Sequence, residues 1–305
     1  MPLRRVGRLL WWPTLATIAA LTACHSDHKS SKDEESAPNH RATTSHTEPS
    51  TETPPSSVDT TAPPPSEPTI EPAWWRPAKG LTWQWQLDGH VDMSVDAEVY
   101  DVDLFETPAS TVQTLHEQGR KAICYFSAGS WEPYRPDSDA FPASVKGGSV
   151  QGWPDERWLD IRQLDVLRPL LASRLDLCAE RGFDGVEPDW LDGYQADTGF
   201  PLTAADQLAF NRMLADMAHE RHLAIGLKND LDQVKDLADL YDFAVVEQCA
   251  EYGECEALIP FLDRNKPVFH AEYDLTVPEF CAESRRLGLS SIRKRIELGP
   301  WRETC

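Results

Sequence analysis

The sequence predicts an α/β protein with one (β/α)₈ barrel of the TIM type, formed by residues 74–305. Three observations predict this fold. Eight short β-rich runs recur along the 232 residues, helical stretches separate several of them, and most runs end in a polar residue. Such alternation is typical of a parallel sheet covered by helices. A doubly wound open sheet is the alternative, but it usually carries a glycine-rich phosphate loop, and neither GxGxxG nor GxxxxGK[ST] occurs here.

The strands are expected in short runs rich in apolar, β-branched and aromatic residues. These runs cover residues 81–86, 97–102, 121–127, 184–189, 223–228, 243–247, 267–271 and 289–293. Between them, residues 164–181 carry leucines at three- and four-residue spacing, which predicts a helix, and Gly182 follows as a C-terminal cap. A second helix is expected over residues 203–222, with Thr203 as its N-cap.

The chain is strongly acidic. It has 50 acidic and 29 basic residues and a formal net charge of −21, and residues 74–305 alone carry −18. Nucleic acid is therefore not an expected partner, because phosphate binding needs a basic surface. A polybasic, lipid-binding patch is excluded on the same ground. The hydrophobic content of 41% and the eleven tryptophans exclude a wholly disordered chain.

The first 73 residues have the composition of an export signal and a tether. Residues 1–23 contain three arginines and then an apolar run that is too short to span a membrane. Residues 21–24 (LTAC) resemble the bacterial lipoprotein box, so we expect lipidation at Cys24. Residues 24–73 hold 17 Ser or Thr and nine Pro among 50 residues, which predicts a disordered linker.

Polar side chains cluster where the expected strands end, at the face of a barrel that carries active sites. Carboxylates that converge there push one another's pKa values apart, so that one is protonated while another is ionised. Hydrolysis of a glycosidic bond by an acid and a base requires such a pair. The alternative is that these acids cap helices or neutralise nearby cations. The aromatic residues suit stacking on sugar rings. The predicted site residues are Trp85, Asp101, Asp103, Tyr125, Asp189, Trp190, Asp192, Lys228, Glu247, Gln248 and Glu272.

Other chemistries lack their motifs. The histidines in residues 219–222 are only three positions apart, which is not the HExxH zinc spacing. No GxSxG serine elbow and no CxxC pair occur. Asp101 and Asp103 are not part of a complete oxygen-ligand loop for a divalent ion. We therefore expect neither a cofactor nor a metal.

Eight stretches in residues 99–274 resemble glycoside hydrolase family 114, the endo-α-1,4-polygalactosaminidases. The resemblance implies a (β/α)₈ fold, cleavage of α-1,4-linked galactosamine polymers, Asp189 as nucleophile and Glu247 as general acid/base. In the motif after the fourth expected strand the family usually has Asn, and this chain has Trp190, which puts fine specificity in doubt. The matching stretches are VYDVDLF, ICYFSAGSWEPYRPD, WLDI, GFDGVEPDWLDGY, GFPLT, GLKND, VEQCAEYGEC and FHAEYD.

Six cysteines remain after Cys24, an even number that suits an exported, disulfide-bonded domain. Six cysteines allow fifteen connectivities. We expect a bridge within the loop beside Glu247, a bridge from the third strand to the next helix, and a bridge at the C-terminal end. The expected pairs are Cys249 with Cys255, Cys124 with Cys178, and Cys281 with Cys305.

Together these features predict a monomeric, lipid-anchored, extracytoplasmic glycosidase that acts on an amino-sugar exopolysaccharide. Its negative charge would attract a cationic, partly deacetylated polymer. Two alternatives stay open. One is a hydrolase of another amino-sugar polymer, which the Trp190 departure allows, and the other is a carbohydrate-binding lipoprotein without turnover.

Overall fold

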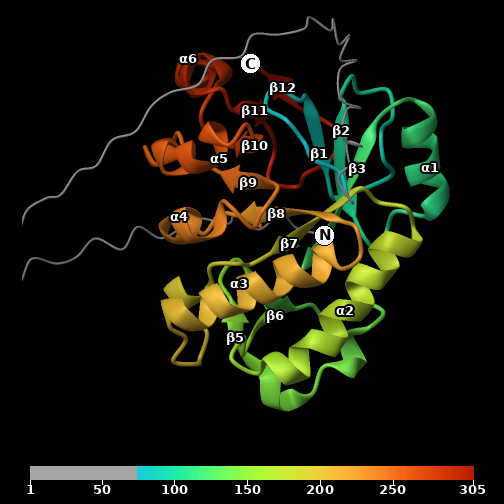
Figure 1. Ribbon diagram of the computed structural model, residues 1–305, viewed down its shortest axis with the longest axis vertical. Helices are drawn as coiled ribbons and strands as arrows, with labels where there is room; N and C mark the ends of the chain where they lie inside the picture. Colours follow the sequence, from blue (N-terminus) through green and yellow to red (C-terminus); the bar gives the residue numbers. More distant parts are fainter. Residues whose placement is uncertain (1–73) are drawn as a thin grey trace, which may run out of the picture. The chain divides into compact units, whose positions relative to one another are not determined.

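A computed structural model describes residues 74–305 of the chain. The predicted signal peptide (1–23), the predicted linker (24–73) and Cys24 lie outside the described residues. The main feature is a nine-stranded sheet in the order β1-β2-β3-β7-β8-β9-β10-β11-β12 (Figure 1). Its first eight strands are parallel, and β12 pairs antiparallel to β11.

All eight predicted strands are present, each within two residues of its expected start. This outcome confirms an α/β protein with a parallel sheet. The strands of the main sheet are β1 (Trp83–Gln86), β2 (Val99–Asp103), β3 (Lys121–Ser127), β7 (Gly185–Asp189), β8 (Ala224–Lys228), β9 (Phe243–Glu247), β10 (Val268–Glu272), β11 (Ser290–Arg293) and β12 (Glu303–Thr304).

The inner face of this sheet encloses an aromatic core. Trp83 and Trp85 of β1 share a buried cluster with Phe243 of β9, Phe269 of β10 and Ile292 of β11. The rings of Trp83 and Phe269 lie 5.1 Å apart, centroid to centroid. Strands from opposite ends of the sheet order meet in one core, so the sheet is curled.

The C-terminal segment bridges the two ends of the curled sheet. Across this seam, the indole N–H of Trp83 donates to the carbonyl of Ser290 at 2.8 Å, and the amide of Gln84 donates to the carbonyl of Pro300 at 2.7 Å. Beyond β1, the backbone N–H of Leu87 donates to Leu298 at 2.9 Å. Within residues 74–305, side chains and the segment 298–304 therefore join β1 to β11, in place of the strand-to-strand ladder that links the other neighbours.

Helices cover the outer face, and α2 packs beside α3 (Figure 1). Three leucines of α2 on the predicted face, Leu167, Leu171 and Leu175, are fully buried. Helix α3 begins with a capping box in which Thr203 Oγ accepts from the Asp206 backbone at 3.2 Å. The helices are α1 (Ala109–Glu117), α2 (Leu164–Glu180), α3 (Ala204–His219), α4 (Val234–Leu237), α5 (Ile259–Asp263) and α6 (Val277–Leu287).

A second sheet lies between β3 and α2 in the chain. It consists of β4 (Ser130–Trp131), β6 (Trp153–Leu159) and β5 (Lys146–Val150), paired antiparallel in that order. A Cβ atom at Gly147 would lie 2.3 Å from the Thr198 carbonyl, so only glycine fits where this sheet meets the loop after β7. The sheet was not predicted, and it carries charged residues toward the strand-end face of the main sheet.

All three expected disulfides are present: Cys124–Cys178, Cys249–Cys255 and Cys281–Cys305. The first joins β3 to α2 and is fully buried. Among residues 74–305, no helix is both long and apolar enough to cross a membrane.

Candidate active site

Asp189 ends β7 and is surrounded by hydrogen-bond donors. Its Oδ1 accepts from Lys228 Nζ at 3.0 Å and from the backbone N–H of Trp190 at 2.8 Å. Its Oδ2 accepts from the Tyr125 hydroxyl at 2.9 Å. The side chain is 14% exposed, so solvent and ligand still reach it. Three donors therefore hold this carboxyl in one position.

Glu247 ends β9, two strands away from Asp189 in the sheet. Its Oε1 accepts from the Tyr273 hydroxyl at 2.5 Å, and its Oε2 accepts from the Asn229 amide at 3.3 Å. Lys228 Nζ lies 3.4 Å from the same Oε2. With a side-chain exposure of 25%, Glu247 is the more open of the two acids.

Lys228 at the end of β8 stands between these two carboxylates and also lies 3.3 Å from Glu187. Burial alone would lower the pKa of this lysine, but the charges of Asp189, Glu247 and Glu187 raise it well above its usual value. Its ammonium also lies 4.8 Å from the centre of the Trp85 ring. The lysine is therefore a fixed cation at the centre of the site.

Two further acids lie in the interior of the sheet, next to Lys228. Asp101 of β2 and Glu187 of β7 are both fully buried. Burial raises the pKa of Glu187 to about 7, although Lys228 opposes the shift. Burial and the Glu187 charge raise the pKa of Asp101 well above its usual value. The site therefore brings together four carboxyl groups and one ammonium.

An ionic cluster built partly by the second sheet lies on the β3 side of the site. Arg135 donates to Glu132 at 2.8 Å and to Asp103 at 3.0 Å. Glu156 of β6 accepts from the hydroxyls of Ser130 at 2.9 Å and Tyr134 at 3.1 Å. Burial, followed by the charge of Glu132, raises the pKa of Glu156 to about 7.

The residues that follow three neighbouring strands have left-handed backbone conformations. Trp190 after β7 has φ 63°, Asn229 and Asp230 after β8 have 51° and 48°, and Gln248 after β9 has 58°. Such conformations cost free energy outside glycine and cluster at functional sites. Asn tolerates this region better than Trp does, which gives a physical reason for the Asn that the family motif usually has at position 190. In this chain the Trp190 ring packs edge-on against Trp158, 4.9 Å away.

Three of the predicted sugar contacts, Trp85, Asp101 and Glu272, have buried side chains. Trp85 belongs to the interior core. Glu272 points to the outer side, where it accepts from the Ala250 backbone N–H at 2.9 Å and bonds His270 at 2.8 Å. Its role is to hold the loop after β9.

The other predicted site residues lie at the strand ends in different environments. Lys228 and Asp103 are nearly buried, and Asp103 is paired with Arg135. Partly exposed side chains remain at Tyr125, Asp189, Trp190, Asp192, Glu247 and Gln248.

The predicted site residues did not include Tyr273, Asn229, Glu187 or the Arg135 cluster. A signal for Tyr273 was available. Side chains alternate between the faces of a strand, so the inward Phe269 and Ala271 imply an inward Tyr273 and an outward Glu272.

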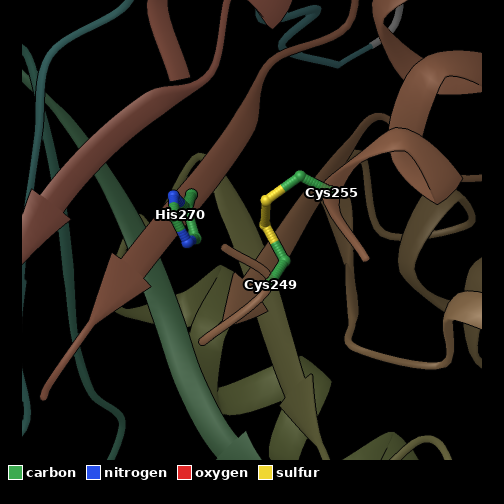
Figure 2. A group of neighbouring side chains, drawn as sticks. All are labelled: Cys249, Cys255 and His270. Atoms are coloured by element: carbon green, nitrogen blue, oxygen red, sulfur yellow. A yellow bond between two sulfur atoms is a disulfide. The ribbon is translucent and has the colours of Figure 1, made fainter. Parts of the chain in front are cut away.

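One group of side chains has the composition of a metal site. Atoms of Cys249, Cys255 and His270 lie within 4.8 Å of one another (Figure 2). The two sulfurs are joined in a disulfide, and the two ring nitrogens of His270 bond Ser291 and Glu272. These residues therefore stabilise the loop that follows Glu247.

Comparisons with known proteins identify the family of this chain. The sequence model described as Glycoside-hydrolase family GH114 matches residues 64–305. A crystal structure of Aspergillus fumigatus Ega3 in complex with galactosamine is 41% identical, covers 76% of this chain and 97% of its own, and has a TM-score of 0.72. The glycoside hydrolase domain of PelA from Pseudomonas aeruginosa is 15% identical, with coverages of 73% and 98% and a TM-score of 0.59, and shows the same fold. No match was found among curated proteins. On the family match and the 41% identical relative, the chain belongs to glycoside hydrolase family 114 and is a glycosidase.

Proposed function

We propose that this protein is an endo-α-1,4-polygalactosaminidase that hydrolyses galactosamine-containing exopolysaccharide. The observation that carries the proposal is the pair of strand-end carboxyls, Asp189 and Glu247, held on one buried ammonium. The complex of the 41% identical relative with galactosamine supports the choice of sugar. The acidic domain supports a cationic substrate, because opposite charges steer association.

In this proposal Asp189 is the nucleophile and Glu247 is the general acid/base. Asp189 accepts three hydrogen bonds of 3.0 Å or less, which fix the position of its carboxyl. Its carboxylate attacks the anomeric carbon, while Glu247 gives a proton to the departing glycosidic oxygen. Glu247 then takes a proton from water, and that water releases the sugar from Asp189. Glu247 suits this exchange because it is the more exposed acid.

The spacing of the two acids supports retention of anomeric configuration. Both carboxyls bond the same ammonium, at 3.0 Å and 3.4 Å. Inverting enzymes need about 6.5–9.5 Å between the carboxyls to admit a water molecule, and retaining enzymes need about 5–5.5 Å. Two oxygens on one nitrogen fit the shorter spacing.

The predicted domain organisation belongs to the same proposal. Residues 1–23 direct export, Cys24 carries lipid, and residues 24–73 tether the domain of residues 74–305 outside the cytoplasm. The three disulfides support this placement, because such bonds form in oxidising compartments. The domain acts as a monomer without a metal or cofactor, and the two carboxyls supply the chemistry.

The test is product formation from purified α-1,4-galactosaminan, in N-acetylated and deacetylated form, followed by mass spectrometry. Wild-type protein should release oligosaccharides of several lengths, while Asp189→Asn and Glu247→Gln should release at least 100-fold less, as expected for loss of a nucleophile or an acid/base. Asp184→Asn, just before β7 at the opposite end of the strand, is the matched control. Undiminished turnover in either site variant would refute the assignment. Absence of products from both polymers would refute the substrate.

A further inference from the structure

Asp101 and Glu187 form a buried acid pair that the proposed reaction does not use. Both side chains are fully buried, one on β2 and the other on β7. The two carboxyls lie close enough for the charge of one to act on the other. Within the described residues, none of their four oxygens accepts a hydrogen bond from an N–H or hydroxyl group. The nearest cation is Lys228, whose Nζ lies 3.3 Å from Glu187 Oε1.

Two ionised carboxyls cannot bond each other, because each offers only acceptors. A proton on one of them would make it a donor to the other. Two buried charges would also need compensation. Lys228 is the single ammonium here, and Asp189 and Glu247 already bond it. The hydroxyls of Tyr125 and Tyr273 are engaged with those same two acids, so they do not satisfy the buried pair.

We propose that Asp101 and Glu187 share one proton at neutral pH, and that this singly charged pair is a positioning element for the catalytic carboxyls. The pair contributes one negative charge next to Lys228. That charge balances part of the ammonium and so sets the net charge beside Asp189 and Glu247. The raised pKa of Glu187, which burial causes, agrees with a group that keeps a proton near neutrality.

Amide substitutions test the charge of the pair because they keep the size of each side chain. In Asp101→Asn the remaining Glu187 ionises and accepts from the new amide, so the charge of the pair stays at one. Glu187→Gln has the same effect with the partners exchanged. The double variant, Asp101→Asn with Glu187→Gln, removes the charge. Comparing the two single variants with the double variant therefore counts the protons on the pair.

The first readout is the pH profile of kcat/KM on any polymer that the enzyme cleaves. The double variant should move both the acidic and the basic limb of the pH profile to lower pH by about one unit, because the negative charge of the pair has been lost. Each single variant should move them much less. A single-variant shift of half the double-variant shift would mean two ionised acids, and no shift in any variant would mean a neutral or uncoupled pair. Either result overturns the proposal.

The second readout, infrared difference spectroscopy, does not depend on activity or on folding of the double variant. Wild type minus either single variant should show one protonated carboxyl at pH 7, and a flat difference would overturn the proposal. Asp242→Asn is the control for pH profiles, since Asp242 is a buried acid at the opposite end of β9. It should lower stability and leave both limbs in place. The pH shifts rest on the roles proposed for Asp189 and Glu247, whereas the infrared result stands without them.

Discussion

At the scale of single residues, Lys228 determines how closely the acids of the site can approach one another. Its side chain is 3% exposed and its ammonium lies within 3.4 Å of Glu187, Asp189 and Glu247. Removing one member of a buried ion pair leaves the other charge without compensation, which costs about 3–5 kcal/mol. The acids depend on this lysine both for proximity and for charge balance.

Lys228→Met should therefore lower the free energy of unfolding by about 3 kcal/mol and reduce turnover at least 100-fold. The control is Lys121→Met on β3, because Lys121 is 45% exposed, although its partner Asp184 is only 11% exposed. An exposed pair contributes less than about 1 kcal/mol. Urea denaturation and turnover should separate the two variants, and equal losses in both would contradict the central role of Lys228.

Residue patterns placed Asp189 and Glu247 at strand ends, where both contact Lys228, but they did not show that Trp85, Asp101 and Glu272 are buried. The position of a strand end is a local property that follows from the apolar run before it. Whether a side chain near that end is open to solvent depends on the neighbouring strands and on the curl of the sheet. Glu187 and Asp101 show this difference, since both lie in strands with strand-end acids and both are fully buried.

At the scale of elements, the disulfides differ in the length of chain that they close. The sequence separations are 54 residues for Cys124–Cys178, 24 for Cys281–Cys305 and 6 for Cys249–Cys255. A cross-link stabilises mainly by restricting the unfolded chain, and its effect grows with the logarithm of the loop length. The three disulfides should therefore differ in how much they stabilise the fold and in how much they influence the site.

Replacing each pair by serines should lower the free energy of unfolding by about 4, 3 and 2 kcal/mol for the loops of decreasing length. Activity should follow another order, because only Cys249–Cys255 lies in the loop directly after Glu247. Loss of this bridge should reduce turnover most while destabilising the fold least. Parallel denaturation and activity measurements check both orders, and a turnover loss that tracks stability would contradict the separation.

The regular elements were more predictable than the inserted sheet. Eight strands and the two main helices follow from apolar periodicity and capping residues. Strands β5 and β6 have the sequences KGGSV and WPDERWL, with glycine, proline and several charges. Neither has the apolar alternation that marks a strand. Their pairing depends on contacts with distant residues, such as the approach of Gly147 to Thr198.

At the scale of the whole molecule, buried acids make stability depend on pH. The pKa is raised to about 7 for Glu156 and Glu187 and to about 8 for Asp230, in each case mainly by burial. A raised acid pKa means that the folded state binds more protons than the unfolded state between about pH 4.5 and pH 7. This contribution to stability is complete below that range and is lost as pH rises through it.

The protein should therefore unfold at higher urea concentration at pH 5.5 than at pH 7.5. Glu156→Gln should flatten this dependence, because the variant has no proton to lose, and one group with such a shift contributes on the order of 3 kcal/mol. Surface-exposed Glu98→Gln is the comparison. A urea midpoint that is higher at pH 7.5 than at pH 5.5 in the wild-type protein would contradict the assignment of these buried acids as protonated.

The acidity of the domain also predicts how salt acts on turnover. Residues 74–305 carry a formal charge of −18, and a deacetylated galactosamine polymer is cationic. Salt screens this attraction beyond about 8 Å at physiological ionic strength. We expect kcat/KM on deacetylated polymer to fall as salt rises, with a smaller change on acetylated polymer. Equal salt dependence on both would contradict steering by charge.

The contacts that join β1 to the C-terminal segment also determine the order in which the parts of the protein can fold. Gln84 and Pro300, which bond across this seam, are 216 positions apart. Contacts of such separation form late, because a long loop must close first. During synthesis the first strand therefore waits for the last residues, and the aromatic interior stays open to water until then. The protein therefore gains its full resistance to unfolding only after this seam has closed.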